Sequence, residues 1–579
     1  MSLVSTPIGM PLLLVGLALL APERAAGQAF PFERPGDEPL ELPDVTRPPE
    51  KPEFELPSLP EPAPKERERL PHQPSLVVRE FEVEGNTVFT PERLREVMDP
   101  YLGHPITSED LHRLRDELTR LYVDAGYVNS GAILPDQEVT DGVVRYQIVE
   151  GRLARIDVAG NRWFRERYLR DRLERGAATP LDVDDLEAEL QILQQDPRIR
   201  RVRAELTPGA RRGEAILKAR FDEVQPLRAW IQADNYEPPS VGAFGGRLRL
   251  AHENLSGNGD VLESFVGLTE GYQNYEGRYS LPVTTADTLL RARFTYNEND
   301  VVEKPFEVLD ISSTSETIGL GLTQPVHRSL RHRVELFVDA EVRKSETFLG
   351  ILPGDDRFSF VAGPEKGVSK LSIVRLGQLW VYRDLDQAIA VRSQASVGLD
   401  LFDATHHSSS SIPDGQFFAW LGQAQWVRRF EPWGLELLLR GDVQLASAPL
   451  LSLEQFSLGG HATVRGYREN EVVRDNGLVG SVELRLPIWR DEARGLRVDL
   501  APFFDMGKGW NHSDHLVTVS PPTELDSRTL TSIGVGLRVR LGEHLFGQIT
   551  WGEQLRDVPT AGEHDLQDSG IQFQVRVSY

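Results

Sequence analysis

Strands of alternating polarity run from Gln225 to the last residue, and they constrain the fold more than any other feature of the sequence. Successive side chains of a strand point to opposite faces, so each such stretch predicts a strand with one apolar and one polar face. The closing strand carries its apolar set at Ile571, Phe573, Val575, Val577 and Tyr579. The alternation recurs in Val334–Val342, Leu435–Leu445, Val482–Leu486 and Ile533–Leu541, where the polar side is Gly534, Gly536, Arg538 and Arg540.

The length of these strands favours a membrane barrel over a soluble sheet. We expect strands of about 9–11 residues, the length that crosses a bilayer when a strand is tilted. With about 22 residues per strand and connection, the region yields about 16 strands, and bacterial outer-membrane barrels use an even, antiparallel number. The barrel must close because lipid offers no partners to an open sheet edge. A soluble all-β protein is the alternative, whereas 26% charged residues and a mean hydropathy of −0.33 exclude a polytopic helical membrane protein.

The first 29 residues predict an export signal. The apolar run Met10–Ala21 is shorter than the roughly 20 residues that a spanning helix needs, and small residues suited to signal-peptidase cleavage follow it. We therefore interpret residues 1–29 as a signal peptide cleaved near 27–29, although Met1–Gly9 contains no Lys or Arg. A short buried helix is the alternative. The chain has no cysteine, which excludes disulfide scaffolds and Cys-ligated zinc and fits a Gram-negative periplasm or outer membrane.

A proline-rich segment follows over residues 30–75. It holds 13 of the 39 prolines of the chain. Each proline fixes its own φ and disfavours helical backbone in the residue before it, so we expect an extended spacer.

Residues 76–150 are expected to form a small domain of order βααββ. Thr107 and Asp110 form the pattern of a capping box, which predicts the start of a helix. That helix carries an apolar stripe at helical spacing, Leu111, Leu114, Leu118 and Leu121. The other expected elements are the strand Val77–Val83, the helix Pro91–Met98, a stop near Gly126, and the strands Ser130–Leu134 and Val143–Val149.

Residues 151–223 repeat this order with a period near 75 residues. A Gly160-Asn161 turn after the strand Ala154–Val158 matches Gly85-Asn86 in the first unit. Asp182 opens a helix with Leu186, Leu190 and Leu193 on one face, and strands near Val202–Thr207 and Ala215–Phe221 follow. Two unrelated α/β pieces are the alternative, but the shared turn and element order favour an internal repeat.

Composition and motifs argue against nucleic-acid binding and against enzymatic catalysis. The formal charge is −24, whereas nucleic-acid binding needs a basic surface that releases phosphate counterions. The sequence lacks the H-E-x-x-H, G-x-S-x-G and Walker A motifs, and no carboxylate pair stands out for acid–base work. His406 and His407 are adjacent in an expected loop, which is a poor arrangement for metal ligands. We predict no catalytic residues, no metal and no cofactor.

Two motifs within the predicted barrel indicate a family. The first is Val464-Arg465-Gly466-Tyr467, in a long connection from about Ala448 to Asp475. The second is Phe503-Phe504-Asp505-Met506-Gly507, an F-x-D-x-G strand motif, and a looser match is the turn Asn254–Asp260. With these motifs the chain resembles the outer-membrane transporters of two-partner secretion (TpsB, the ShlB/FhaC/HecB haemolysin secretion/activation proteins). The resemblance covers nearly the whole mature chain and identifies the two repeats as periplasmic POTRA domains, 76–150 and 151–223, before a barrel over 224–579.

The phase of the second motif can be derived from alternation alone. Leu496, Val498, Leu500, Pro502, Phe504 and Met506 share one face, which must meet lipid. Asp505 is therefore expected in the lumen together with Phe503 and Gly507. The resemblance implies that the long loop folds back into the barrel and that Arg465 meets Asp505. Arginine suits this role because its planar fork binds a carboxylate through two parallel hydrogen bonds. An ordinary surface loop and an unexceptional lumen carboxylate are the alternative.

The resemblance also implies a function. The chain is expected to be an outer-membrane pore that secretes, and in some members activates, a large partner exoprotein without ATP. Implied partners are the exoprotein on the POTRA domains, outer-membrane lipid, and the barrel assembly machinery through the C-terminal strand with Phe573, Val575, Val577 and Tyr579. A general outer-membrane protein insertase and a passive porin are the rival functions, and two POTRA repeats favour secretion. The family often carries an N-terminal plug helix, but the prolines of residues 30–75 argue against a regular helix there.

Overall fold

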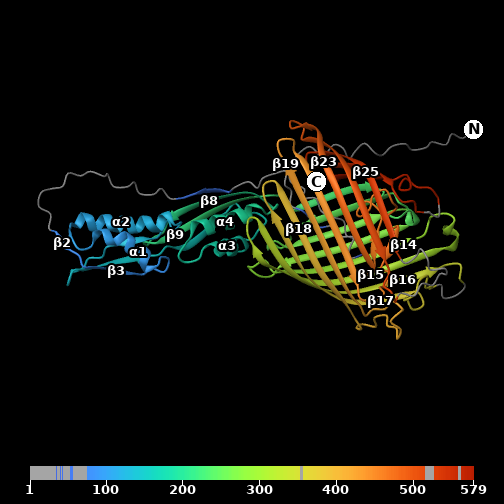
Figure 1. The fold of residues 1–579 in the computed structure, drawn as a ribbon, viewed down its shortest axis with the longest axis horizontal. Helices are drawn as coiled ribbons and strands as arrows, with labels where there is room; N and C mark the ends of the chain where they lie inside the picture. The colour runs from blue at the N-terminus through green and yellow to red at the C-terminus, as the bar shows by residue number, and fades with distance from the viewer. Residues whose placement is uncertain are drawn as a thin grey trace, which may run out of the picture. The chain divides into compact units, whose positions relative to one another are not determined.

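The computed structural model of the chain describes residues 34, 40, 42, 52–56, 75–352, 357–514, 527–558 and 563–579. The chain divides into two compact units, which are described separately (Figure 1). One comprises Pro49–Gln225 with Gly257–Gly259, and the other comprises Met1–Pro48, Pro226–Ser256 and Asp260–Tyr579. The predicted signal peptide lies outside the described residues, as does most of the proline-rich segment.

The first repeat has the expected order βααββ, with a short additional strand pair, β2 and β4. Thr107 caps the second helix, and its side chain and that of Asp110 form a reciprocal capping box. The helix buries Leu114, Leu118 and Tyr122 against a sheet of order β3-β6-β5. The elements are β2 (Leu76–Val77), β3 (Glu80–Glu84), α1 (Pro91–Met98), η1 (Asp99–Tyr101), β4 (Pro105–Ile106), α2 (Ser108–Asp124), β5 (Gly131–Ile133) and β6 (Val143–Val149).

One predicted strand of this domain is wrong in its extent. Val77–Val83 does not form a single strand, because the chain changes partners within it. Val77 pairs with β4, whereas β3 begins at Glu80 and pairs in parallel with β6. Between them the Arg79 amide donates to the Gly142 carbonyl at 2.8 Å.

The second repeat has the same topology, with an additional strand from the proline-rich segment. In both domains the first strand of the βααββ unit pairs in parallel with the last strand, and the last strand pairs antiparallel with the strand before it. The short strand β1 (Glu53–Glu55) adds to the free edge of β8 in parallel, giving the order β1-β8-β9-β7. The other elements are β7 (Arg152–Ala159), α3 (Glu166–Leu173), η2 (Glu174–Gly176), α4 (Val183–Gln194), β8 (Ile199–Pro208) and β9 (Glu214–Glu223).

Sixteen antiparallel strands close into a barrel, as the sequence predicts. Closure joins β10 to β27, where Ile231 lies opposite Val577. The strands are β10 (Leu227–Asp234), β11 (Gly245–His252), β12 (Val261–Leu268), β13 (Tyr272–Pro282), β14 (Leu289–Asp300), β15 (Ile311–Arg328), β16 (His332–Leu349), β17 (Val368–Arg383), β18 (Gln387–Leu399), β19 (Phe418–Phe430), β20 (Leu435–Ala446), β23 (Asn476–Asp491), β24 (Leu496–Trp510), β25 (Ser527–Leu541), β26 (Leu545–Gln554) and β27 (Ile571–Ser578). Two short 3₁₀ helices, η3 (Pro239–Val241) and η4 (Phe306–Leu309), lie in connections.

The faces of the strands follow the predicted alternation, but the strand lengths do not. Phe504 and Met506 are 42% and 46% exposed on the outer face, whereas Asp505 between them is 0% exposed. β15 and β16 have 18 residues each, well beyond the predicted length. A hairpin can keep pairing after it leaves the lipid, so the membrane thickness sets only a minimum length.

Parts of the proline-rich segment lie in the barrel unit. Leu40 is 5% exposed and packs with Val381 and Ala390, and Leu42 packs beside it. Neither residue is in a helix. Among the described residues, no helix is long and apolar enough to cross a membrane.

Candidate functional site: the loop in the barrel lumen

The connection between β20 and β23 spans residues 447–475 and folds into the lumen. Within it, β21 (Phe456–Leu458) and β22 (Val472–Arg474) pair as a short hairpin. The loop forms one apolar cluster with lumen-facing side chains of the barrel wall. Its members are at most 2% exposed: Leu421, Phe456, Leu458, Val464, Tyr467, Val472, Val479 and Leu530. This burial fixes the loop against the inner wall.

Arg465 lies at the tip of this loop and binds Asp505 of β24. Its Nε donates to Asp505 Oδ2 at 2.8 Å and its Nη2 donates to Asp505 Oδ1 at 2.9 Å. The guanidinium carbon also lies 3.7 Å from the centre of the Phe503 ring. Both side chains are almost fully buried, at 10% and 0% exposure. The geometry is a two-point carboxylate clamp with a cation–π contact, so the guanidinium binds Asp505 through its edge and Phe503 through a face.

The surroundings of this pair are ionic as well. Arg465 Nη1 binds Glu483 of β23, a carboxylate that also pairs with Arg485 and Arg538. Ser481 Oγ donates to Asp505 Oδ1 at 2.6 Å. Two carboxylates thus face one loop arginine. The sequence analysis did not single out Glu483, although its place in the polar phase of the predicted strand Val482–Leu486 was a usable signal.

The other residues of the two motifs fit together sterically. Gly466 has a φ of +91°, and a Cβ there would lie 2.7 Å from the Gly552 carbonyl oxygen, so only glycine is accommodated. A Cβ on Gly507 would lie 2.8 Å from Val464 Cγ2, so the last residue of the strand motif makes room for the first residue of the loop motif. Tyr467 Oη lies 2.9 Å from the carbonyl oxygens of Thr531 and Arg556.

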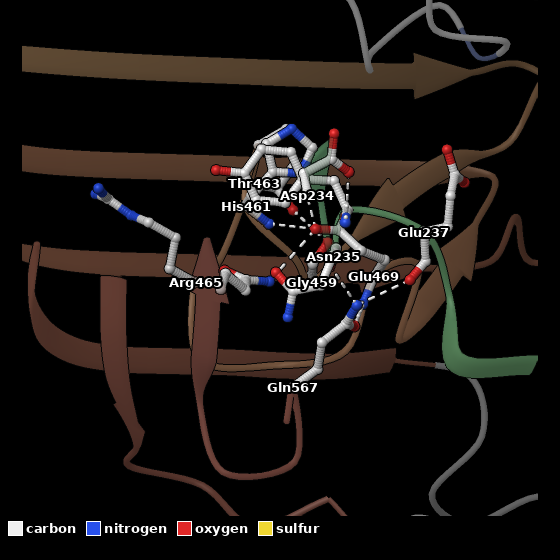
Figure 2. Close-up of polar contacts among 12 residues, drawn as sticks. Asp234, Asn235, Glu237, Gly459, His461, Thr463, Arg465, Glu469 and Gln567 are labelled. Atoms are coloured by element: carbon white, nitrogen blue, oxygen red, sulfur yellow. Dashed lines mark hydrogen bonds and ion pairs between the residues drawn. The ribbon is translucent and has the colours of Figure 1, made fainter. Parts of the chain in front are cut away.

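A polar network ties the loop to the connections that adjoin the two strands of the barrel closure, β10 and β27 (Figure 2). His461 Nδ1 lies 2.8 Å from Glu469 Oε1 within the loop, and the Glu469 amide donates to Gln567 Oε1 at 2.9 Å. Gln567 Nε2 donates to the carbonyl oxygens of Asn235 and Glu237, both at 2.8 Å. Figure 2 shows the Arg465 side chain pointing away from this network. The two sets of contacts therefore hold the loop independently.

Arg468 adds a third polar contact of the loop tip. Its Nε and Nη2 bind the two carboxylate oxygens of Asp568, the latter at 2.7 Å, and its Nη1 binds Glu303 Oε1 at 2.8 Å. These acceptors lie in the connections after β26 and β14. The loop tip thus bridges connections on different parts of the barrel rim.

The stem of the loop has a separate ionic anchor, which was not predicted from the sequence. Glu454 is 1% exposed and binds Arg343 of β16 at 2.7 Å and Arg375 of β17 at 2.8 Å. Arg375 also pairs with Glu341 at 3.1 Å. Arg343 and Arg375 are at lumen-facing positions of the adjacent strands β16 and β17, but no sequence pattern indicated which loop carboxylate would reach them.

The remaining sequence-predicted residues lie elsewhere. Val575 and Val577 are 48% and 50% exposed on the outer face of β27, on the same side as Phe573, and Tyr579, directly after the strand, is 58% exposed. In the turn Asn254–Asp260, Asp260 accepts hydrogen bonds from Ser256 and from Tyr279. His407 Nε2 lies 2.6 Å from the Gly363 carbonyl oxygen in a connection of the barrel.

Comparisons with known proteins agree with this architecture. Residues 213–539 match the family described as haemolysin secretion/activation protein ShlB/FhaC/HecB, and residues 76–151 match the ShlB-type POTRA domain. The chain is 22% identical to the outer membrane transporter CdiB of Dickeya dadantii over 454 residues, covering 76% of this chain and 77% of the relative. It is 25% identical to the hemolysin transporter protein ShlB of Serratia marcescens over 417 residues, covering 68% and 69%. The solved structure of CdiB from Escherichia coli has the same fold, with a TM-score of 0.63, 22% identity, and coverage of 90% of this chain and 94% of that one.

The fold defines an outer-membrane transporter, a 16-stranded barrel preceded by periplasmic POTRA domains and holding a loop within its lumen. Because the family match spans more than half of the chain, the protein belongs to the haemolysin secretion/activation protein family, ShlB/FhaC/HecB. It is a two-partner secretion transporter of the outer membrane.

Proposed function

We propose that this transporter secretes one dedicated large exoprotein, such as a haemolysin or a filamentous adhesin, through the lumen of its barrel. The observation that carries the proposal is the buried contact of Arg465 with Asp505, which holds a loop across the lumen by breakable ionic bonds. Such a loop closes the pore at rest and can open it when these contacts separate.

The POTRA domains are proposed to receive the passenger. We assign residues 76–150 and 151–223 to these domains and 224–579 to the barrel. An unfolded chain can bind by adding a strand to a sheet edge, which supplies backbone hydrogen bonds without requiring a particular sequence. The pairing of β1 with β8 supports this mode, because an extended segment already adds to that edge.

Release of the loop is proposed to open the path. Arg465 would leave Asp505 and Glu483, and Arg468 would leave Asp568 and Glu303. Glu454 would keep the stem on β16 and β17, so the tip swings and the stem stays. Folding of the passenger outside the cell would make transport directional without ATP. We infer no catalytic step, no cofactor and no nucleic-acid partner. The exposed outer face of β27, with Val575, Val577 and Tyr579, would meet lipid and present the assembly signal to the barrel assembly machinery.

The test compares a clean deletion strain with its parent. The culture supernatant and the outer membrane are analysed by quantitative proteomics, with a complemented strain as the control. We expect one large protein to disappear from the supernatant while outer-membrane barrels keep their abundance. A broad loss of outer-membrane barrels would instead support the insertase function, and unchanged fractions under conditions that express the passenger would contradict the proposal.

A further inference from the structure

Six apolar side chains form a patch on the inner wall of the barrel, and this lumen patch consists of Leu379, Val381, Ala388, Ala390, Val427 and Leu438. They lie on the adjacent strands β17–β20 and are neighbours across them. Val381 pairs with Ala390, Ala388 pairs with Val427, and Val427 pairs with Leu438. The patch is therefore continuous over four strands.

The lumen patch lies at the end of the barrel where the chain enters it. β10 begins there at Leu227, and the short turns after β17 and β19 are at the same end because the strands alternate in direction. Deeper in the lumen the same strands carry polar side chains, including Arg375, Gln394 and Asp442. A polar lumen is usual for such barrels, so an apolar area at its mouth needs a partner.

The proline-rich segment supplies that partner in the structure. Leu40 packs on Val381 and Ala390, and Leu42 packs on the cluster of Ala388 and Val427 with Leu438. Ala388 and Ala390 are 0% exposed although they face the lumen. Their small side chains leave room for the two leucines. The spacing of two residues is that of an extended chain, which directs alternate side chains to the same side.

We propose that the lumen patch is a binding site for an extended peptide segment with apolar side chains two positions apart. Leu40 and Leu42 occupy it at rest, and a passenger segment with the same alternation takes their place during transport. This second part rests on the proposed function. Alternating apolar residues are what a chain destined to form β-structure carries, so the site suits such a passenger.

The first test measures binding of a labelled peptide to the purified full-length protein. The probe is a fluorescein-labelled peptide that copies residues 38–43, EPLELP, and the readout is fluorescence anisotropy. Replacing both tail leucines, Leu40→Ser with Leu42→Ser, should free the site and tighten binding at least tenfold over the parent protein. The matched control is Leu56→Ser, a half-exposed leucine of the same proline-rich segment, which should leave binding at the parent level.

Two lumen variants locate the binding. Added to the tail variant, Val427→Asn should weaken binding at least tenfold by placing an amide in the patch. Ala390→Leu fills the space that the leucines use and should do the same without adding a polar group. Heat-modifiable migration in gels verifies that each barrel is folded, and Ala390→Leu decides the matter if Val427→Asn does not fold.

A second peptide separates apolar recognition from charge attraction. The patch is bordered by Arg383, Arg392 and Arg440 in the lumen phase, and the probe carries two glutamates. The peptide EPSESP keeps both glutamates and should not bind measurably. Equal binding of both peptides, or binding of EPLELP that ignores both lumen variants, would overturn the site.

The peptide assay involves neither a passenger nor secretion, so its result is independent of the proposed function. Loss of one secreted protein in the deletion strain together with failure of EPLELP to bind would leave the function standing and remove the site. Displacement is tested in secreting cells with a photo-crosslinker at position 381. It should link to the tail without passenger and to the passenger when one is expressed, and linkage to the tail alone in both states would overturn the second part.

Discussion

Arg465→Ala should loosen the tip of the lumen loop. The free energy that this substitution costs can be worked from the contacts. The substitution removes two hydrogen bonds to Asp505, at 2.8 and 2.9 Å, together with the ion pair to Glu483. It leaves the Asp505 carboxylate 0% exposed beside Ser481 and the amide of residue 465. A charge pair about 4 Å apart is worth about 4 kcal/mol at an effective dielectric near 20. Breaking a buried pair by removing one partner costs about 3–5 kcal/mol.

Water in the lumen reduces this cost, so we expect Arg465→Ala to weaken the seating of the loop tip by about 2–4 kcal/mol. That range corresponds to a change of about 30- to 1,000-fold in the ratio of released to seated tip. Asp505→Ala removes the same contact from the other side and should have a similar effect. In the double variant the loss of free energy for seating the tip should be at most about 1 kcal/mol larger than in either single variant, because both substitutions break the same Arg465–Asp505 interaction.

Hydrogen exchange measured by mass spectrometry on the full-length protein tests this prediction. Exchange of the peptides covering residues 459–471 should accelerate in all three variants, while the barrel strands keep their protection. Arg497→Ala is the control, since Arg497 pairs with Glu436 and Asp499 on the same inner wall but makes none of the loop contacts described above. Unchanged loop exchange in Arg465→Ala, or effects that add in the double variant, would refute a contribution of the Arg465–Asp505 contact to holding the tip.

Three further predictions use the same exchange measurement. Gly466→Ala should prevent seating of the tip because its Cβ would meet the Gly552 carbonyl at 2.7 Å. The control is Gly103→Ala, which has open space around it and should leave the loop unchanged. Equal effects of the two variants on loop exchange would argue against the steric account. Glu454→Gln should loosen the stem by about 1.5–3 kcal/mol, because it removes charged hydrogen bonds to Arg343 and Arg375. Residues 450–456 should then exchange faster while the tip stays seated. Release of the tip as well would contradict a separate anchor. Thr107→Ala should cost about 1 kcal/mol by removing the cap of α2 and raise exchange in that helix about fivefold, with no effect in the barrel.

Alternation was enough to predict the barrel, because a closed sheet in lipid forces each strand to separate apolar and polar faces. It placed Asp505 and Arg538 in the lumen and Phe504 on the lipid side without any knowledge of pairing. The capping box at Thr107 was equally readable, because its two partners are three residues apart. Local patterns therefore predicted the features whose physics is local.

The remaining parts of the site depend on contacts distant in sequence. Glu454 meets arginines about 80 and 110 residues away, and no periodicity encodes that distance. The packing of Leu40 into the lumen was likewise hidden, since proline spacing indicates an extended chain but not its location. The strand Val77–Val83 was overextended because alternation continues through the point where the chain changes partners.

The central claim is that the passenger crosses the lumen of this barrel, and one crosslinking experiment tests it most directly. Thr317 and Ile318 are neighbours on β15, at 6% exposure on the lumen face and 59% on the outer face. A photo-crosslinker at each position is activated in cells that are secreting the passenger. Crosslinks to the passenger at position 317 and none at position 318 are predicted. Crosslinks at position 318 alone, or equally at both positions, would contradict passage through the lumen.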